Sequence, residues 1–384
     1  MALQTPTPSA SSAQSGVYKL DLSEVLSSIL LDDTDFLSEV GVSGDAATQT
    51  KHSWIEDALN ATTIKQTAGN SYLSGTSSTV IVFSANISRI TAGTLLRDQI
   101  SGTVGEVVQV TAVNGVSATV TRGYGSSSPV AHASAATYDI IANPRPQGMT
   151  GPADESTTRS LVYNYTQIFS KGVNLTGTAL AIEHAGVSQE DDYQIDLRLR
   201  ELKRELDRTL IMGIRAPNDV TTGTYGTMGG IIEFCSFLNT GNLVTTAETL
   251  TPSVLNTLAK KCWDNGATPS FVLVGGVQKQ KISTFDQEYR RSTLDTRRAG
   301  YTVEEFVSDL GVNLRIIVDR WMPNDVCIVG DMSRVKVMPL MGRAFSLEKL
   351  AKTGDRELWQ IVGEYTAEFR NADKAFASHL NLKQ

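Results

Sequence analysis

A long amphipathic helix is the feature of this sequence that most constrains its fold. Ser188 can cap the start of the helix, acidic side chains follow on the first turn, and Gly213 can close its far end. Charged residues occupy most of its faces, and apolar residues recur at 4-3-4-4 spacing, at Ile195, Leu199, Leu202, Leu206 and Leu210. At 1.5 Å per residue, a helix over 188–212 is about 37 Å long. We expect a helix of this length to form the framework of a domain.

The negative charge of the chain is concentrated in its first 60 residues. This segment holds two basic and nine acidic residues, a difference equal to the formal net charge of −7 of the whole chain. It opens with Pro, Ser and Thr and has only short apolar clusters, so it cannot bury much surface by itself. We expect residues 1–45 to form an N-terminal arm that lies on another surface. A short helix packed on its own domain is the alternative.

Residues 79–141 show short β-type runs separated by turn signals. Asn114-Gly115 lies between two Val-rich runs, which predicts a tight hairpin. The flanking segments 48–60 and 160–178 are expected to be extended, since the second is rich in Val, Tyr, Thr, Ile and Phe. The pattern predicts a small all-β module, at about 75–145, set within a long two-stranded excursion.

The second half of the chain indicates mixed α and β structure. Hydrophobic residues make up 41% of the 384 residues, enough to close a core. Thr251-Pro252 and Asn265-Gly266 bracket a helix, and another helix is expected near 277–285. Strands are expected around 271–274, 314–318, 326–329 and 335–338, followed by a β-rich C-terminal stretch. The predicted fold class is α+β.

Two pairs of arginines lie on one expected loop, over 287–301. They are Arg290, Arg291, Arg297 and Arg298. A guanidinium group binds both phosphates and carboxylates with paired hydrogen bonds. The loop is therefore expected to contact either phosphate or the acidic side chains of a neighbouring subunit.

The sequence offers no pattern for catalysis or metal binding. Its three cysteines and four histidines are scattered, unlike a disulfide framework or a paired zinc site. HExxH, GxSxG and Walker-type motifs are absent, and the first residues do not form a secretory signal. The chain also lacks an apolar run of about 20 residues and a basic surplus. We therefore expect no catalytic residue, no cofactor, no metal, no membrane partner and no sequence-specific binding of nucleic acid.

Four stretches carry a resemblance to a known family. They are SWIEDALN (53–60), GEVVQVTAVNGVSATVTRGYGSS (105–127), NYTQIFSKGVNLTGTALAIEHAG followed by ELKRELDRTLIMG (within 164–213), and LEKLAKTGDRELWQIVGEYTAEFRNADKAF (347–376). In this order they extend from residue 53 nearly to the C-terminus. The chain resembles the major capsid proteins of tailed bacteriophages, in the group whose extended loop carries a β insertion.

The resemblance implies the Hong Kong 97-type fold, which encapsulin shells share. It maps 1–45 to the N-terminal arm and 46–180 to the extended loop, with its β insertion at about 75–145. Residues 181–220 and 340–384 would form the peripheral domain, which contains the spine helix. Residues 221–339 would form the axial domain.

The resemblance also implies a non-enzymatic subunit that assembles into pentamers and hexamers of an icosahedral shell around double-stranded DNA. The expected location is the virion capsid, after assembly in the host cytoplasm. Expected partners are copies of the chain, a separate scaffolding protein, a portal, packaged DNA through non-specific contacts and, as an open case, a cement or decoration protein. Encapsulin-like compartment shells and β-rich decoration or adhesion proteins are the alternatives.

Six side chains are expected to contact neighbouring subunits if the chain is a shell subunit. Two lie near the base of the extended loop and four are the paired arginines. They are Trp54, Arg159, Arg290, Arg291, Arg297 and Arg298.

Overall fold

The computed structural model describes residues 34–383 with short gaps. The gaps are 58, 61, 70–72, 85–86, 100–104, 146, 149–155, 183–189, 220, 222, 239–240, 286–289, 294–301 and 353. The chain divides into two compact units. The main unit comprises 1–54 and 161–384, and the insert unit comprises 55–160.

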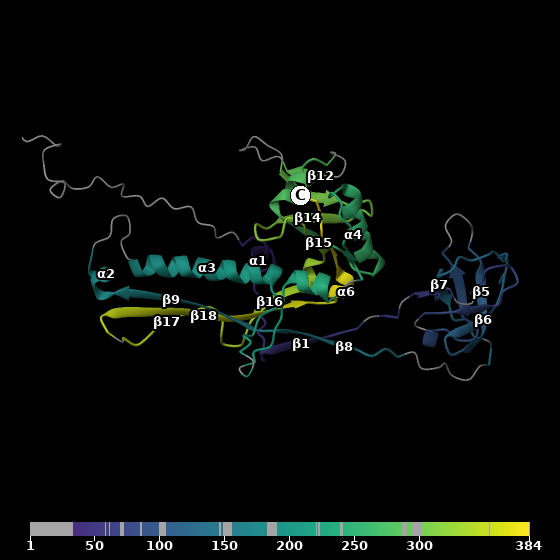
Figure 1. The fold of residues 1–384 in the computed structure, drawn as a ribbon, viewed down its shortest axis with the longest axis horizontal. Helices are drawn as coiled ribbons and strands as arrows, with labels where there is room; N and C mark the ends of the chain where they lie inside the picture. Colours follow the sequence, from purple (N-terminus) through teal and green to yellow (C-terminus); the bar gives the residue numbers. More distant parts are fainter. Residues whose placement is uncertain are drawn as a thin grey trace, which may run out of the picture. The chain divides into compact units, whose positions relative to one another are not determined.

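A long helix on a narrow sheet forms one part of the main unit (Figure 1). Helix α3 (Glu190–Met212) lies along strands β9 (Gln167–Thr176) and β18 (Arg356–Phe369). Strand β18 pairs antiparallel with β9 on one side, and with β16 (Val335–Pro339) and β17 (Ser346–Lys349) on the other. Leu202, Leu206 and Leu210 are buried against this sheet, which confirms the predicted amphipathic helix.

A seven-stranded mixed sheet forms the other part of the main unit. Its strand order is β10-β19-β15-β11-β14-β13-β12. The strands are β10 (Leu243–Val244), β11 (Phe271–Val274), β12 (Arg290–Thr293), β13 (Thr302–Val307), β14 (Asn313–Val318), β15 (Cys327–Gly330) and β19 (Phe376–His379). The predicted strands around 271–274, 314–318 and 326–329 are therefore confirmed.

Helices cover this sheet at the places that the capping pattern predicts. Helix α4 (Pro252–Asp264) begins after Thr251, whose side chain accepts a hydrogen bond from Val254 N, and ends at Asn265. Helix α5 (Gly276–Ile282) follows β11 directly and is shorter than predicted. Smaller elements are α2 (Gly177–Ala181), α6 (Ala372–Ala375), the 3-10 turn Met332–Arg334 and the π-helix Glu233–Phe237. None of the helices in the described part of the chain is long and apolar enough to span a membrane.

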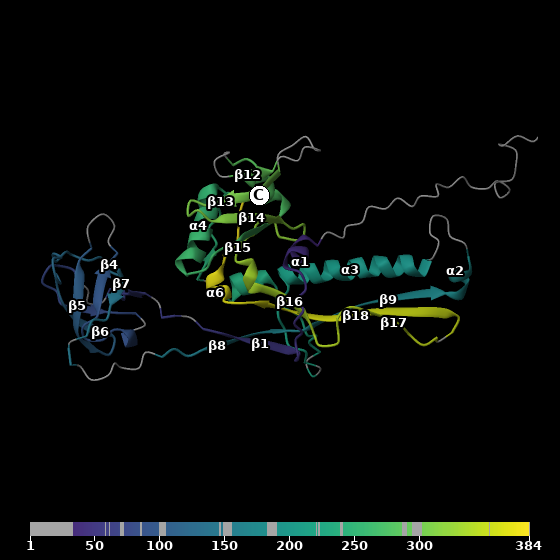
Figure 2. The ribbon, with the colours of Figure 1, turned by 180° about the vertical axis from the view of Figure 1, so that it is seen from behind.

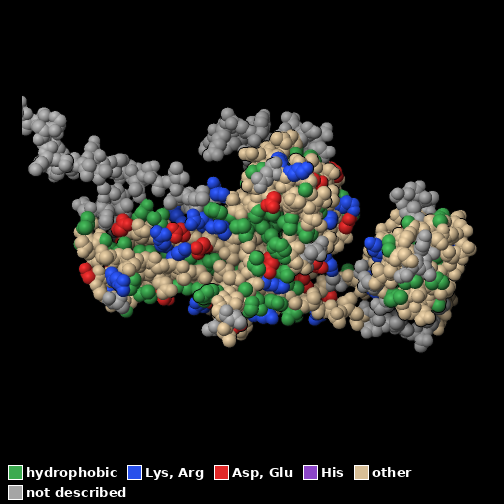
Figure 3. Space-filling view, viewed as in Figure 1, with side chains coloured by type: hydrophobic (Ala, Val, Ile, Leu, Met, Phe, Trp, Pro, Cys, Tyr) green, Lys and Arg blue, Asp and Glu red, His purple; other side chains and the backbone are tan. Residues whose placement is uncertain are grey.

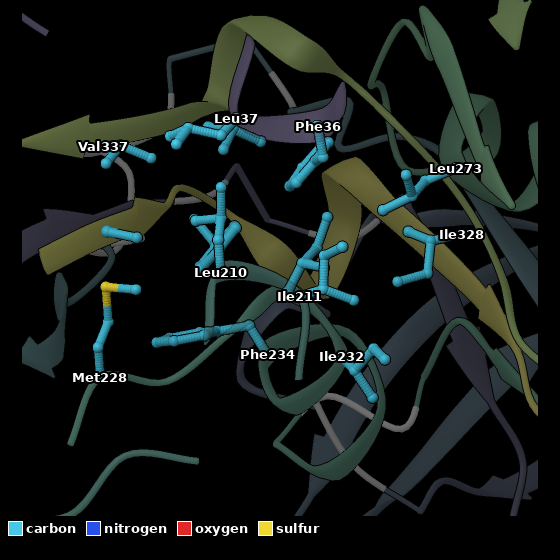
Figure 4. Close-up of a cluster of buried hydrophobic side chains, with 14 of the residues drawn as sticks. Phe36, Leu37, Leu210, Ile211, Met228, Ile232, Phe234, Leu273, Ile328 and Val337 are labelled. Carbon is cyan, nitrogen blue, oxygen red and sulfur yellow. The ribbon is translucent and has the colours of Figure 1, made fainter. Parts of the chain in front are cut away.

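Helix α1 (Asp35–Val40) packs into the core of the main unit. Phe36 and Leu37 face Leu210 and Ile211 of α3 (Figure 4), and the Phe36 ring lies 6.1 Å from that of Phe271. For this part of the expected arm, the alternative of a short helix on its own domain is therefore the observed one. Residues 1–33 lie outside the described residues.

The insert unit is a small closed barrel. Its strand order is β2-β7-β4-β5-β6-β3, and the bridge between Gln66 and Phe83 joins the two outer strands. Closure removes the exposed sheet edges through which chains aggregate. The strands are β2 (Thr63–Lys65), β3 (Val80–Val82), β4 (Leu95–Asp98), β5 (Val107–Asn114), β6 (Ser117–Thr121) and β7 (Thr137–Ala142), with a 3-10 turn at Ile87–Arg89.

The predicted hairpin joins β5 to β6. Asn114 pairs with Ser117, so the two-residue loop is Gly115-Val116 and begins one position later than an Asn-Gly loop would. Gly115 has φ +59°, a left-handed conformation that glycine adopts without a steric penalty. The main unit continues into the insert through a two-stranded ribbon of β1 (Lys51–Glu56) and β8 (Ser160–Tyr165), visible from both sides in Figures 1 and 2.

Candidate assembly surfaces

The base of the ribbon is fixed to the main unit by a stack around Tyr163. Lys51 Nζ lies 4.0 Å and Arg215 Cζ 4.5 Å from the centroid of the Tyr163 ring, within the range of cation–π attraction. Arg215 Nη1 also donates to the Tyr163 carbonyl oxygen, at 2.8 Å. Glu233 Oε2 accepts from Arg215 N at 2.7 Å. The Glu233 carboxyl group is buried, and burial raises its pKa although Arg215 opposes the shift.

A second clamp joins β1 to β18. His52 Nε2 lies 2.6 Å from Glu368 Oε1, and Arg370 Nε donates to Glu368 Oε2 at 2.6 Å. Burial of Glu368 opposes ionisation, but the hydrogen bonds from His52 and Arg370 prevail and lower its pKa. The base of the ribbon is therefore joined to the main unit by charged hydrogen bonds.

Trp54, one of the expected subunit contacts, lies in the core of the main unit. Only 6% of the residue is exposed, and its ring lies 5.9 Å from that of Phe234. The sequence did not predict that Trp54 is buried, because the π-helix that contains Phe234 is about 180 positions away in the chain. A contact between Trp54 and a neighbouring subunit stays a prediction, and it would involve only the small exposed part of the residue.

The expected arginines fall into three groups. The Arg159 side chain is 74% exposed in the insert unit, with Nε 4.0 Å from Asp57 Oδ2, and an exposed pair of this kind contributes little stability. Arg290 and Arg291 lie on β12, which pairs with β13 at the edge of the seven-stranded sheet, so this part of the expected loop is a strand. Arg297 and Arg298 lie outside the described residues. Their subunit contacts stay predictions.

The ribbon and the chain just beyond it expose large apolar side chains that sequence reasoning did not name. Ile55 is 65% exposed, Leu161 64% and Leu59 97%. Trp54 and Ile55 are successive residues of one strand and point to opposite faces, so burial of the first leaves the second in solvent. Alternation along SWIE was the signal that could have identified Ile55. In Figure 3, hydrophobic side chains are likewise visible at the surface of the main unit.

The interior of the insert unit contains a buried polar network. Glu106 accepts hydrogen bonds from Arg122 Nε at 2.8 Å and Nη2 at 2.6 Å, and from the backbone N atoms of Gly123 and Val130. Burial opposes ionisation of Glu106, but these donors and His132 lower its pKa to about 2. Both carboxylate oxygen atoms of Glu106 are fully occupied by donors of the insert unit, so the group suits a structural role.

His132 joins a second carboxylate to the same network. Its Nδ1 lies 2.9 Å from Asp98 Oδ2 and 2.9 Å from Tyr138 Oη, and its Nε2 lies 3.0 Å from Glu106 Oε2. Burial raises the pKa of Asp98, against the attraction of His132. Across the described ranges, no group of three or more His, Cys, Asp or Glu side chains has an arrangement suited to a metal ion.

Comparison with known proteins identifies the family. The family model described as SU10 major capsid protein matches residues 5–383. The major capsid protein of Escherichia phage Phieco32 is 23% identical over 258 residues, which cover 54% of this chain and 72% of that protein.

A solved capsid structure has a similar chain fold. The capsid of a native GTA particle matches with a TM-score of 0.52 at 10% identity, over 99% of this chain and 100% of that chain. A structure from Mycobacterium phage Adephagia matches with a TM-score of 0.48 at 10% identity, over 99% of each chain. The α+β class and the Hong Kong 97-type fold predicted from the sequence are confirmed. This chain belongs to the SU10 major capsid protein family and is a structural component of the capsid of a tailed bacteriophage.

Proposed function

We propose that the chain assembles with its own copies into pentamers and hexamers of an icosahedral shell that encloses packaged double-stranded DNA. The observation that carries this proposal is the apolar surface of the ribbon, where Ile55 and Leu161 are exposed on a two-stranded element that has no core of its own. A two-stranded ribbon is marginally stable in water unless something packs on it.

Burial between subunits supplies that packing. Covering a Leu or Ile side chain completely contributes about 1.5–3 kcal/mol. Each subunit of a closed shell makes the same contacts, so a modest gain per subunit is repeated around the particle. The cost of ordering the ribbon on association offsets part of the gain.

The domain roles follow the same proposal. Residues 1–45 act as the arm, which α1 anchors on the main unit. Residues 46–180 act as the extended loop, 181–220 and 340–384 as the peripheral domain, and 221–339 as the axial domain. The separate insert unit, α3 on its sheet and the seven-stranded sheet support this division. Two strands pair with the other domain. Strand β16 lies within the proposed axial range but pairs with β18 in the sheet under α3. Strand β19 lies within the proposed peripheral range but pairs with β15 in the seven-stranded sheet.

The proposed partners are a separate scaffolding protein, a portal and a cement or decoration protein, with assembly in the host cytoplasm. The net charge of −7 supports weak, non-specific contact with DNA, because release of counterions by basic side chains is the main source of non-specific affinity for a duplex. A container that must release its DNA benefits from weak contacts with it.

The test is a double substitution, Ile55→Ser with Leu161→Ser, in the chain expressed together with the adjacent head-assembly genes of its phage. We expect at least a tenfold loss of closed particles in negative-stain micrographs, while the unassembled subunit keeps its melting temperature. Val116→Ser is the matched control, because Val116 is an exposed apolar residue in the loop of the insert. Normal shells from the double variant would refute the proposed role of the ribbon.

A further inference from the structure

Two buried carboxylates meet beside helix α1. Asp207 belongs to α3, Asp319 follows β14, and both side chains are almost completely buried. Leu37 N donates to Asp207 Oδ1 at 2.8 Å, and Phe36 N donates to Asp319 Oδ2 at 3.1 Å. Successive backbone N–H groups of α1 are therefore held by one carboxylate from the long helix and one from the seven-stranded sheet.

The second oxygen atoms of the two carboxylates differ in their surroundings. Asp319 Oδ1 accepts a hydrogen bond from Trp321 N at 2.7 Å. Asp207 Oδ2 is buried and has no donor among the described residues. The Asp207 and Asp319 side chains lie within hydrogen-bonding reach of each other, and neither carboxylate can donate unless one of the two is protonated. A single proton on Asp207 would satisfy both groups.

The electrostatic environment favours that proton. Burial is the largest cause, and the neighbouring charge of Asp319 the next, of the rise of the Asp207 pKa to about 8. The charge of Asp35 on α1 acts in the same direction. Two carboxylates at close range in a medium of low dielectric constant cannot both ionise without a large repulsion.

The cations nearby are directed to other groups. Arg315 Nη1 on β14 pairs with Glu39 Oε2 at 2.6 Å, and the Arg204 and Arg208 guanidinium carbons lie 5.9 and 5.1 Å from the Trp321 ring centroid. Within the described part of the chain, no ion pair joins a cation to Asp207 or Asp319. The charged groups on the elements packed around the pair include Asp35, Glu39, Lys203, Arg204, Glu205, Arg208, Arg315, Arg320 and Lys336.

We propose that Asp207 and Asp319 share one proton that latches α1 onto the main unit, so that α1 is docked while the proton is present and loosens when both carboxylates are ionised. Loosening would withdraw Phe36 and Leu37 from the core that they share with Leu210 and Ile211 (Figure 4). The latch sits where the N-terminal segment joins the main unit. It concerns the single chain and does not depend on shell assembly.

The direction of the pH effect follows from proton binding. The unfolded carboxyl loses its proton near pH 4, whereas the folded one keeps it up to about pH 8. Between these values the folded state binds more protons than the unfolded state, so its stability falls as the pH rises. Above about pH 8 both states have lost the proton, and the repulsion stays as a constant penalty.

Hydrogen exchange in the purified full chain tests the latch. Exchange of residues 35–40 is measured at pH 6 and pH 9 and corrected for the intrinsic rates. We expect protection of this segment to fall at least tenfold between the two values, because the shared proton is lost near pH 8. Equal protection of residues 35–40 at both values would overturn the proposal.

A substitution separates the shared proton from other effects of pH. Asp207→Asn keeps the acceptor for Leu37 N and supplies a permanent donor toward Asp319, so protection should be the same at pH 6 and pH 9. Asp196→Asn, at an exposed acid of the same helix, should behave like the wild type. A tenfold loss in Asp207→Asn would also refute the latch. Should that variant fail to fold, the wild-type comparison alone decides.

Discussion

At the scale of single residues, burial decides what a charged side chain does in this protein. Arg122 and Arg159 both belong to the insert unit, and both have an acidic partner. Arg122 is buried, binds Glu106 with two nitrogen atoms and donates to the carbonyl oxygens of Gly75 and Ser78 at 2.6 and 3.0 Å. Arg159 is exposed and lies at the limit of ion-pair distance. The first therefore holds the fold, whereas the second contributes little to it.

Arg122→Met should destabilise the insert unit by about 3–5 kcal/mol, because it leaves the Glu106 carboxylate buried without its main counter-charge. The free energy of unfolding of the insert, followed by hydrogen exchange in the full chain, is the measurement. Arg97→Met, at an exposed arginine of β4, is the control and should change it by less than about 0.5 kcal/mol.

The same comparison has a pH dependence with a defined sign. The pKa of Glu106 is lowered to about 2, so the stability that its ionised form contributes is present above pH 4.5 and is lost as the pH falls toward 2. The difference between the wild type and Arg122→Met should therefore shrink over this range. A constant difference down to pH 2 would show that Arg122 acts through packing alone.

Trp54 and Ile55 offer a matched pair for a second prediction. Trp54→Ala should destabilise the main unit by about 3–5 kcal/mol, because it removes a large buried ring next to Phe234. Ile55→Ala should leave the melting temperature of the subunit nearly unchanged, since the residue is exposed. Thermal unfolding of the two variants in unassembled form is the measurement. An unchanged melting temperature in Trp54→Ala would mean that the residue acts only between subunits.

At the scale of elements, α1 belongs to the acidic leader by sequence and to the core of the main unit by packing. Its sequence lies within the acidic leader, where composition predicts an arm. Its Phe36 and Leu37 nevertheless fill the main core, and Glu39 pairs with Arg315. The helix has only six residues and no side-chain cap, so tertiary packing and the two carboxylates, rather than intrinsic helix propensity, hold it.

Two truncations separate these roles. Deleting residues 1–33 keeps α1 and should abolish closed particles if the arm is needed for assembly. Deleting residues 1–45 should in addition lower the free energy of unfolding by about 3–6 kcal/mol, through the loss of the buried Phe36 and Leu37. Calorimetry of the subunits and micrographs of the particles test both. Closed shells from the shorter truncation would remove the arm from the assembly mechanism.

At the scale of the whole molecule, the chain consists of two units that each close a core. The insert unit buries its own apolar cluster inside a closed barrel, and the Glu106 carboxylate at its centre is satisfied by donors of the same unit. The main unit combines the long helix, its narrow sheet and the seven-stranded sheet. The ribbon that joins the units keeps Trp54 in the core of the main unit and leaves Ile55 and Leu161 exposed, which is the basis of its proposed role in contacts between subunits.

Local patterns in the sequence were sufficient to predict the long helix, the β insert with its hairpin, the capped helix α4 and the family. Each of these depends on periodicity or on turn residues within a few positions of one another. Such patterns show which face of an element is apolar, and the order of the elements carries the resemblance to phage capsid proteins.

The pairings between distant segments were decided only by the tertiary structure. Glu106 and Arg122 are 16 positions apart, and Asp207, Asp319 and α1 come from three distant parts of the chain. Trp54 is buried and Ile55 exposed because the π-helix covers one face of β1 and not the other. Periodicity describes one element at a time, whereas burial and the pairing of charges depend on which elements meet. That choice is made by the packing of the whole chain.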